Sequence, residues 1–419
     1  MEILRIRGGT RLEGSVPVSG AKNAALPILF AGILSDRPSS LRNVPDLADI
    51  KTTLKVLETL GIRVERAGDR VSLHAEKLSS IEAPYDLVRT MRASVLVLGP
   101  LLARAGEAKV SLPGGCAIGA RPVDFHLSAL ERLGAQFEIE SGFIHGRAPR
   151  GLRGAIMDLP FPSVGATENA LMAAVLATGT SEIRNAACEP EIVDLARALR
   201  SMGSKITGEG TPVIRVEGVS SLQGMDHAIA PDRVEAATFL CAGLISRGKV
   251  RVTGISPDYL GSALEVLQTL GARISSGPDW VEAEAMGPLS PANIKTAPFP
   301  GFPTDMQAQF MALMTQAQGT SIIEEAIFEN RFMHVPELAR LGARIRIQGN
   351  EAQVDGPVRL SGATVMATDL RASASLVIAG VVASGETIIR RIYHLDRGYE
   401  KLELKFGTLG ADIRREIEK

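Results

Sequence analysis

Apolar side chains recur at helical spacing in six places along the chain, each time just before a Leu-Gly or Met-Gly pair. In Leu47–Leu57, Ile192–Met202 and Leu260–Leu270 they step by three or four residues, which places them on one face of a helix. The glycines of the six pairs are Gly61, Gly134, Gly203, Gly271, Gly342 and Gly410. They lie 68 to 73 residues apart, and glycine suits the left-handed residue that ends a helix. The pattern predicts six copies of one unit of about 70 residues.

Each unit also contains a second, more apolar helix, as in Asn23–Leu34, Ala93–Ala103 and Ala372–Val382. This helix leads through a glycine-containing turn into a short strand. A β-rich stretch follows the Leu-Gly pair and often has a Gly-Asp or Gly-Asn turn, as in Ile62–Leu73 and Ala343–Val354. Because a helix with little polar face is buried on most sides, we expect three apolar helices wrapped by sheets in each of two α/β domains.

The first and last units indicate how the chain is divided. The sixth unit has one strand after Gly410 and no hairpin partner, whereas a strand-like segment, Glu2–Val18, precedes the first unit. We expect that segment to complete the C-terminal half, with the chain crossing back near Gly224–Pro231. The expected domains are 22–229 and 230–419 plus 1–21, with three repeats in each.

Charge and composition exclude several classes of partner. The net charge is −1 and aromatic residues make up 4%, so neither a global field nor base-stacking side chains indicate nucleic acid. The segment Met1–Arg7 is charged and lacks a signal-peptide core, and no apolar run is long enough to span a membrane. We therefore expect a cytoplasmic protein with no membrane insertion, in which a local cluster of cations holds any anionic ligand.

Basic residues recur at two equivalent places in the units, the start of the buried helix and the loop between strand and amphipathic helix. They are Lys22, Arg92, Arg121, Arg331, Arg371 and Arg397. A solvated helix end explains each one taken alone. As a set they predict a site for several negative charges, because helix N-termini favour anions through their free amides and dipole.

The segment Pro113–Pro122 contains three glycines and Cys116 and predicts a loop that closes over a ligand. It matches neither a Walker loop nor a dinucleotide fingerprint. A cysteine near Arg121 should be accessible, with a lowered pKa, and the alternative is a spectator thiol in a hairpin. Cys241 lies in an apolar helix and is expected to be buried, and Cys188 is expected to be structural. Because the cysteines and histidines have no ligand spacing, we expect no metal site.

Six motifs in order point to one family. They are Ser19–Ala24, Met91–Ser94, Pro113–Asp124, Phe302–Gln307, Phe328–Phe332 and Asp369–Arg371. From Gly8 to about Gly410 the chain resembles the UDP-N-acetylglucosamine 1-carboxyvinyltransferases, which are enolpyruvyl transferases. The resemblance implies an α/β fold of two inside-out α/β barrel domains, each of three repeated units. It implies transfer of the enolpyruvyl group of phosphoenolpyruvate to the 3′-hydroxyl of UDP-N-acetylglucosamine, without metal or cofactor, at the start of bacterial peptidoglycan synthesis.

The resemblance also implies roles for particular residues. Cys116 would protonate the methylene carbon, Asp305 would take the proton of the attacking hydroxyl, and Lys22 would join them as a catalytic residue. Phosphoenolpyruvate would be bound by Lys22, Asn23, Arg121, Arg331, Arg371 and Arg397. The nucleotide sugar would be bound by Asn23, Arg92, Arg121, Pro122, Val123, Asp124, Phe125, Ser163, Val164, Gly165, Asp305 and Ile327.

Two alternatives stay open at this point. Within the same fold, 3-phosphoshikimate 1-carboxyvinyltransferase also uses phosphoenolpyruvate, but it lacks the cysteine loop around Cys116. A non-catalytic repeat scaffold is the second alternative, because stacked repeats often only bind partners. Such a scaffold does not need six cations at helix starts.

Overall fold

The computed structural model describes residues 2–88, 91–112 and 123–418. Contacts between residues divide the chain into two compact units. The N-terminal unit comprises the described residues between Gly20 and Ala230, and the C-terminal unit comprises residues 2–19 and 231–418. None of the helices in the described part of the chain has the length and apolar character that crossing a bilayer requires.

Each unit has its most apolar helices in its interior. They are α1 (Lys22–Ala31), α4 (Leu98–Ala105) and α6 (Val164–Ala174) in the N-terminal unit, and α8 (Arg233–Ile245), α10 (Gln307–Met314) and α12 (Leu370–Val382) in the C-terminal unit. In the C-terminal unit the three helices pack against one another. Every residue of α8 is buried, which is why that helix needs no polar face.

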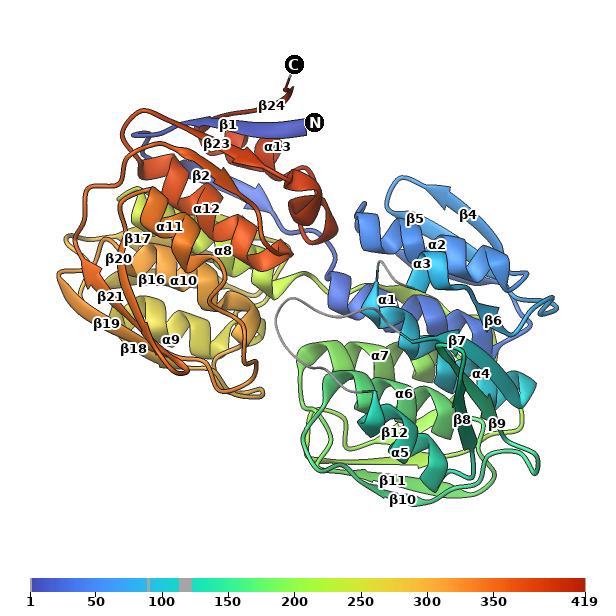
Figure 1. Cartoon of the computed structure of the whole chain (residues 1–419). Coiled ribbons are helices and arrows are strands. Elements are labelled where there is room, and N and C mark those ends of the chain that lie inside the picture. Colours follow the sequence, from blue (N-terminus) through green and yellow to red (C-terminus); the bar gives the residue numbers. More distant parts are fainter. Residues whose placement is uncertain (1, 89–90, 113–122, 419) are drawn as a thin grey trace. The chain divides into compact units, whose positions relative to one another are not determined.

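Six four-stranded sheets lie outside these helices (Figure 1). In the N-terminal unit the sheet orders are β14 (Asp226–Ala228), β3 (Ser39–Arg42), β5 (Arg70–His74), β4 (Arg63–Ala67); β6 (Glu82–Ala83), β7 (Glu107–Ser111), β9 (Phe143–Arg147), β8 (Gln136–Glu140); and β10 (Ile156–Asp158), β11 (Thr180–Arg184), β13 (Val213–Glu217), β12 (Lys205–Thr207). In the C-terminal unit they are β2 (Glu13–Pro17), β15 (Lys249–Thr253), β17 (Trp280–Ala285), β16 (Ala272–Gly277); β18 (Asn293–Lys295), β19 (Gly319–Glu324), β21 (Glu351–Gly356), β20 (Arg344–Gln348); and β22 (Thr364–Met366), β23 (Glu386–Arg390), β1 (Glu2–Arg7), β24 (Asp412–Ile417).

The predicted amphipathic helices are confirmed in all six repeats. They are α2 (Ala48–Thr59), α5 (Asp124–Arg132), α7 (Pro190–Ser201), α9 (Gly261–Thr269), α11 (Val335–Arg340) and α13 (Leu402–Thr408). The glycines that follow them have φ between 93° and 99°, the left-handed conformation expected from the sequence. The remaining helical segments are α3 (Tyr85–Val88) and the short turns η1 (Gly32–Leu34), η2 (Arg92–Val97), η3 (Pro257–Tyr259), η4 (Thr304–Met306) and η5 (Ile392–Arg397).

The start of the chain belongs to the C-terminal unit. Strand β1 lies between β23 and β24 and pairs antiparallel with both, so it occupies the place that a hairpin strand fills in the other sheets. Strand β2 pairs parallel with β15, and strand β14, from the middle of the chain, pairs parallel with β3 of the N-terminal unit. The chain therefore crosses twice between the units, and each crossing segment contributes an edge strand. The first contributes β2 to the sheet of β15, and the second contributes β14 to the sheet of β3.

Replacing Leu4 with alanine should destabilise the C-terminal unit. Leu4 in β1 is 0% exposed, and a buried Leu→Ala change costs about 2–5 kcal/mol. We expect faster hydrogen exchange in β23 and β24 and unchanged exchange in the N-terminal unit. Leu404, which is 61% exposed in the same unit, is the matched control, and its alanine variant should exchange like the unchanged protein. Lost protection in β3 or β5 instead would contradict the assignment of β1.

Candidate functional site

The carboxylate of Asp305 lies between two arginines in the C-terminal unit. Asp305 stands in η4, at the start of α10, and its side chain is 28% exposed. Arg331 donates from Nη2 to its Oδ1 at 2.8 Å, and Nε of Arg371 lies 3.6 Å from its Oδ2. Both arginine side chains are at most 6% exposed. The structure therefore brings together three of the residues that the sequence predicted for the site.

Arg371 is held at the beginning of α12. The side chain of Asp369 accepts hydrogen bonds from the backbone of Arg371 and from the next residue, at 2.8 and 2.9 Å, and so caps the helix. Burial by itself lowers the pKa of Arg371, but Asp232, Tyr399 and Asp305 together raise it above its usual value. Its Nε and Nη1 have no hydrogen-bond partner in the described part of the chain. A charged guanidinium with unused donors suits an anionic ligand.

Glu325 is a residue of this site that sequence reasoning missed. Its buried carboxylate accepts hydrogen bonds from the hydroxyls of Thr296 and Thr304, both at 2.8 Å, and from the backbone of Ile327 at 2.9 Å. It thereby ties the turn that carries Asp305 to the backbone that was predicted to meet the nucleotide sugar. In the sequence, a glutamate directly after a strand looks like a solvated loop residue. The available sign of its role was the presence of its two hydrogen-bond donors, Thr296 and Thr304.

Arg397 ends the η5 turn, which packs against the beginning of α12. Its neighbour Asp396 accepts from Arg415 of β24 at 2.6 Å, which anchors the turn to the sheet. A Cβ added at Gly398 would lie 2.6 Å from Leu370 Cδ1, so any larger residue there requires the Leu370 side chain to move. The same unit thus holds Asp305, Arg331, Arg371 and Arg397 near the N-termini of its inner helices.

In the N-terminal unit the predicted cation Lys22 forms a buried ion pair. It is the first residue of α1, and its Nζ lies 3.1 Å from Oδ2 of Asp49 in α2. The two side chains are 8% and 7% exposed. Asn23, the next residue, is half-buried. Asp49 was not predicted, because its place inside an amphipathic helix gave no sign that it faces a lysine.

The two predicted segments for the nucleotide sugar meet at the starts of α5 and α6. His126 links them, because a Cβ at Gly165 would lie 2.8 Å from its ring, and its Nδ1 lies 3.0 Å from Nδ2 of Asn169. Asn169 also accepts from the backbone of Gly99 at 2.8 Å. This contact places Val123–Phe125 beside Ser163–Gly165. Arg92 stands at the start of η2 and is half-buried.

Comparison with known proteins assigns the chain to a family. Residues 6–406 match the family described as EPSP synthase (3-phosphoshikimate 1-carboxyvinyltransferase). The chain belongs to this family of enolpyruvyl transferases. A relative from Nitratidesulfovibrio vulgaris (strain Hildenborough) is 58% identical over 419 residues, all of both chains, and one from Shewanella pealeana is 55% identical over 417 residues, 99% of both. Both of these relatives are named UDP-N-acetylglucosamine 1-carboxyvinyltransferase.

Solved structures confirm the enolpyruvyl transferase fold. The enolpyruvyl transferase NikO from Streptomyces tendae has a TM-score of 0.89 and 28% identity, with 99% of this chain and 98% of that chain covered. An EPSP synthase from Acinetobacter baumannii has a TM-score of 0.76 at 19% identity over the full length of both chains, which speaks for the fold alone. The predicted fold class, an α/β fold of inside-out domains built from repeats, is therefore confirmed.

Several expected residues of this enolpyruvyl transferase lie outside the described residues. They are Cys116, Arg121 and Pro122. The other two cysteines are described. Burial raises the pKa of the Cys241 thiol in α8, and the half-buried Cys188 thiol also has a raised pKa, through burial and the nearby Glu189. The buried position expected for Cys241 is confirmed.

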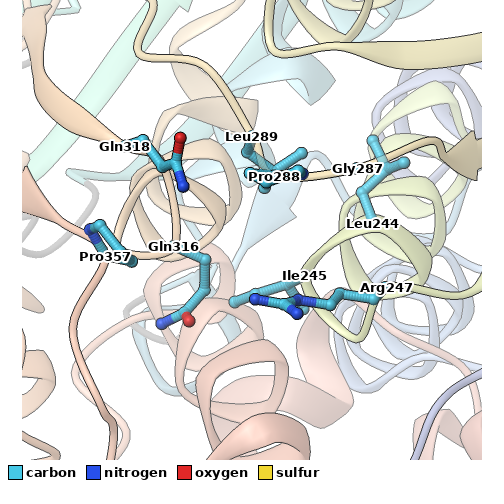
Figure 2. A pocket seen from close by; sticks show the side chains of 9 residues that line it. All are labelled: Leu244, Ile245, Arg247, Gly287, Pro288, Leu289, Gln316, Gln318 and Pro357. Carbon is cyan, nitrogen blue, oxygen red and sulfur yellow. The ribbon is translucent and has the colours of Figure 1, made fainter.

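Figure 2 shows a small pocket in the C-terminal unit of the enolpyruvyl transferase. It is lined by Leu244, Ile245 and Gln316 at the C-terminal ends of α8 and α10, whereas Asp305 is at the other end of α10. Its cavity volume of about 30 Å³ holds on the order of one water molecule. We therefore place the candidate site at the helix N-termini and not in this pocket.

Proposed function

We propose that this chain transfers the enolpyruvyl group of phosphoenolpyruvate to the 3′-hydroxyl of UDP-N-acetylglucosamine and releases phosphate. The observation that carries this proposal is 54–58% identity, over at least 99% of this chain, to relatives with that name. The family description names 3-phosphoshikimate as acceptor, but the EPSP synthase structures are only 19% identical to this chain. The reaction is the first committed step of bacterial peptidoglycan synthesis.

The reaction is an addition followed by an elimination. The hydroxyl oxygen bonds to C2 of phosphoenolpyruvate while C3 gains a proton, which gives a tetrahedral intermediate. The bond from C2 to the phosphate oxygen then breaks, C3 loses a proton, and the double bond returns. Negative charge is present throughout, so fixed cations in a dry site stabilise the reacting groups.

In this proposal the C-terminal unit supplies the base and part of the anion site. Asp305 takes the proton of the attacking hydroxyl, a role for which a positioned carboxylate is suited. Arg331 and Arg371, which flank Asp305, and Arg397 beside α12 bind the donor anion.

The N-terminal unit supplies the acceptor site and the remaining donor contacts. Lys22, Asn23 and Arg121 contact phosphoenolpyruvate, and Cys116 protonates C3. The residues proposed to bind the nucleotide sugar are Asn23, Arg92, the segment 121–125, Ser163–Gly165, Asp305 and the backbone at Ile327. The close approach of α5 to α6 through His126 supports this placement.

Domain limits and location complete the proposal. The proposed domains are 22–229 and 230–419 with 1–21. The boundaries of the two compact units along the chain, between Ser19 and Gly20 and between Ala230 and Pro231, support these limits. The protein acts in the cytoplasm, where both substrates are produced, and needs no metal or cofactor.

The test of this function is phosphate release from phosphoenolpyruvate with each acceptor in turn. UDP-N-acetylglucosamine should support release in the presence of a metal chelator, and shikimate 3-phosphate should not. Release with shikimate 3-phosphate alone would establish the alternative transferase. Absence of release with both acceptors would favour a non-catalytic scaffold.

An epoxide phosphonate that mimics phosphoenolpyruvate should alkylate Cys116 and spare the other thiols. The raised pKa values of Cys188 and Cys241 disfavour their thiolates, which are the reactive forms. UDP-N-acetylglucosamine should speed the labelling, and a Cys116→Ser variant should not be labelled. Peptide mass mapping identifies the modified residue, and labelling mainly at Cys188 would remove Cys116 from the mechanism.

A further inference from the structure

Three buried polar side chains form a cluster next to the Asp305–Arg371 pair inside the C-terminal unit, and the mechanism above does not use them. They are Thr238 on α8, Gln309 on α10 and Tyr399, which follows η5 by two residues. Thr238 and Gln309 are 0% exposed and Tyr399 is 2% exposed. Polar groups at this depth need hydrogen-bond partners, so their arrangement is constrained.

The hydrogen bonds among these side chains run in one direction. The hydroxyl of Thr238 donates its only hydrogen to the carbonyl of Val234 at 2.8 Å, so it accepts from the Tyr399 hydroxyl at 2.9 Å. The Tyr399 oxygen in turn accepts from Nε2 of Gln309 at 3.0 Å. The same Nε2 also lies 3.2 Å from the backbone carbonyl of Asp305 and 3.3 Å from the Thr238 hydroxyl, so these two acceptors share its second hydrogen.

The guanidinium of Arg371 lies over the ring of Tyr399. The Arg371 Cζ lies 5.4 Å from the ring centroid, within the range of a cation–π contact. Nε of Arg371 lies 3.6 Å from the Asp305 carboxylate. The contacts therefore form a closed circuit from the Asp305 carbonyl through Gln309, Tyr399 and Arg371 to the Asp305 carboxylate.

This circuit fixes the guanidinium without using up its donors. Nε and Nη1 of Arg371 have no hydrogen-bond partner in the part of the chain that the structure describes, so the contact with the Tyr399 ring holds the group while these two donors stay available. Gly398 lies next to this group, because a Cβ there would be in van der Waals contact with Arg371 Nη1 at 3.5 Å. Along the chain, only Gly398 separates Tyr399 from the turn that ends at Arg397.

We propose that Tyr399 is a positioning residue for the donor substrate, holding Arg371 and, through Gln309, the Asp305 turn in the geometry that binds phosphoenolpyruvate. The inference rests on the proposed function in one respect, namely that phosphoenolpyruvate is the anion at Arg371. The proposal predicts different effects on the binding of the two substrates. Loss of Tyr399 should weaken donor binding more than acceptor binding, since most of the proposed acceptor contacts, other than Asp305, do not depend on it.

The test compares KM values for the two substrates in variants of the full chain. Tyr399→Phe keeps the ring and removes the hydroxyl with its hydrogen bonds to Thr238 and Gln309, and we expect the KM for phosphoenolpyruvate to rise about tenfold. Tyr399→Leu also removes the ring, and we expect a rise of roughly 100-fold. The KM for UDP-N-acetylglucosamine should rise much less than that for phosphoenolpyruvate in both variants, because Asp305 is only one of several proposed contacts to the acceptor.

Thr238→Val provides a second route to the same hydrogen bond. It removes the acceptor of the Tyr399 proton, so its effect on the KM for phosphoenolpyruvate should match that of Tyr399→Phe. The double variant should be no worse than either single one, because coupled residues are not additive. Tyr393→Phe is the matched control, since Tyr393 belongs to the same turn, is 54% exposed, and should leave both KM values unchanged.

Two results would overturn the proposal. One is an unchanged KM for phosphoenolpyruvate in Tyr399→Phe, and the other is a parallel rise of both KM values, which a merely structural role produces. If Tyr399→Leu does not fold, the KM values of Tyr399→Phe and Thr238→Val still test the proposal. If the unchanged protein uses shikimate 3-phosphate, the proposed acceptor is wrong, but the donor is the same and the comparison of KM values still applies. If it turns over neither acceptor, calorimetric titration with phosphoenolpyruvate tests Tyr399 directly.

Discussion

Replacing Asp305 with asparagine should lower kcat by roughly 10²–10⁴-fold, the range attributed to a general base. Asparagine has nearly the shape of aspartate but cannot take a proton from the attacking hydroxyl. It also removes the charge that faces Arg331 at 2.8 Å and Arg371 at 3.6 Å. The KM for phosphoenolpyruvate should rise much less than kcat falls, because both cations remain in place. Single-turnover kinetics of the purified variant provide the measurement.

The control for this variant is Asp412→Asn. Asp412 in β24 also forms an ion pair with an arginine, Arg414, at 3.3 Å, but its side chain is 41% exposed. A surface pair contributes about 0–1 kcal/mol, so this change should leave both stability and turnover close to those of the unchanged protein. A kcat for Asp305→Asn within tenfold of the unchanged value would show that another group takes the proton.

Replacing Lys22 with methionine should lower both stability and turnover. The change removes the cation that lies 3.1 Å from Asp49, whose side chain is 7% exposed. Breaking a buried ion pair costs about 3–5 kcal/mol, which thermal or urea unfolding measures. If Lys22 also binds the donor, kcat/KM for phosphoenolpyruvate should fall about 10²–10³-fold, as on loss of a donor that stabilises reacting charge.

The double variant Lys22→Met with Asp49→Asn separates the two effects. Stability should recover in large part, since no charge is left buried in the pair, whereas turnover should stay low because the donor still lacks its cation. Lys51→Met is the matched control on α2, because Lys51 pairs with Asp46 at 3.0 Å with side chains 60% and 41% exposed. Recovery of turnover in the double variant would mean that Lys22 only supports the fold.

The architecture could be predicted from the sequence because its determinants are local. The left-handed glycine at the end of each amphipathic helix and the step of three or four residues before it need no knowledge of distant contacts. Even the position of β1 followed from an unpaired strand in the last repeat. Element limits were less accurate, since the helix expected from Ala93 is a short turn as far as Val97 and α4 begins only at Leu98.

The partners of the site residues could not be predicted in this way. Asp49 lies 27 residues from Lys22, Thr296 lies 29 residues from Glu325, and Tyr399 lies 161 residues from Thr238. Each of these contacts depends on how helices and strands pack, which the repeat pattern does not encode. The sequence also treated every cation as available for a ligand, whereas the structure pairs Lys22 and Arg331 with carboxylates of the protein.

The place of β1 has a consequence for the order in which the protein is made. Arg5 in β1 and Glu416 in β24 are hydrogen-bonded partners 411 residues apart. At a ribosomal rate of about 5–20 residues per second, roughly 20–80 s pass between the synthesis of the first strand and that of its last partner. The N-terminal unit, whose strands lie between Ser39 and Ala228, can fold during that interval. The first strand to leave the ribosome is therefore among the last to be built into a sheet, and until then its apolar side chains lack their native neighbours in β23 and β24.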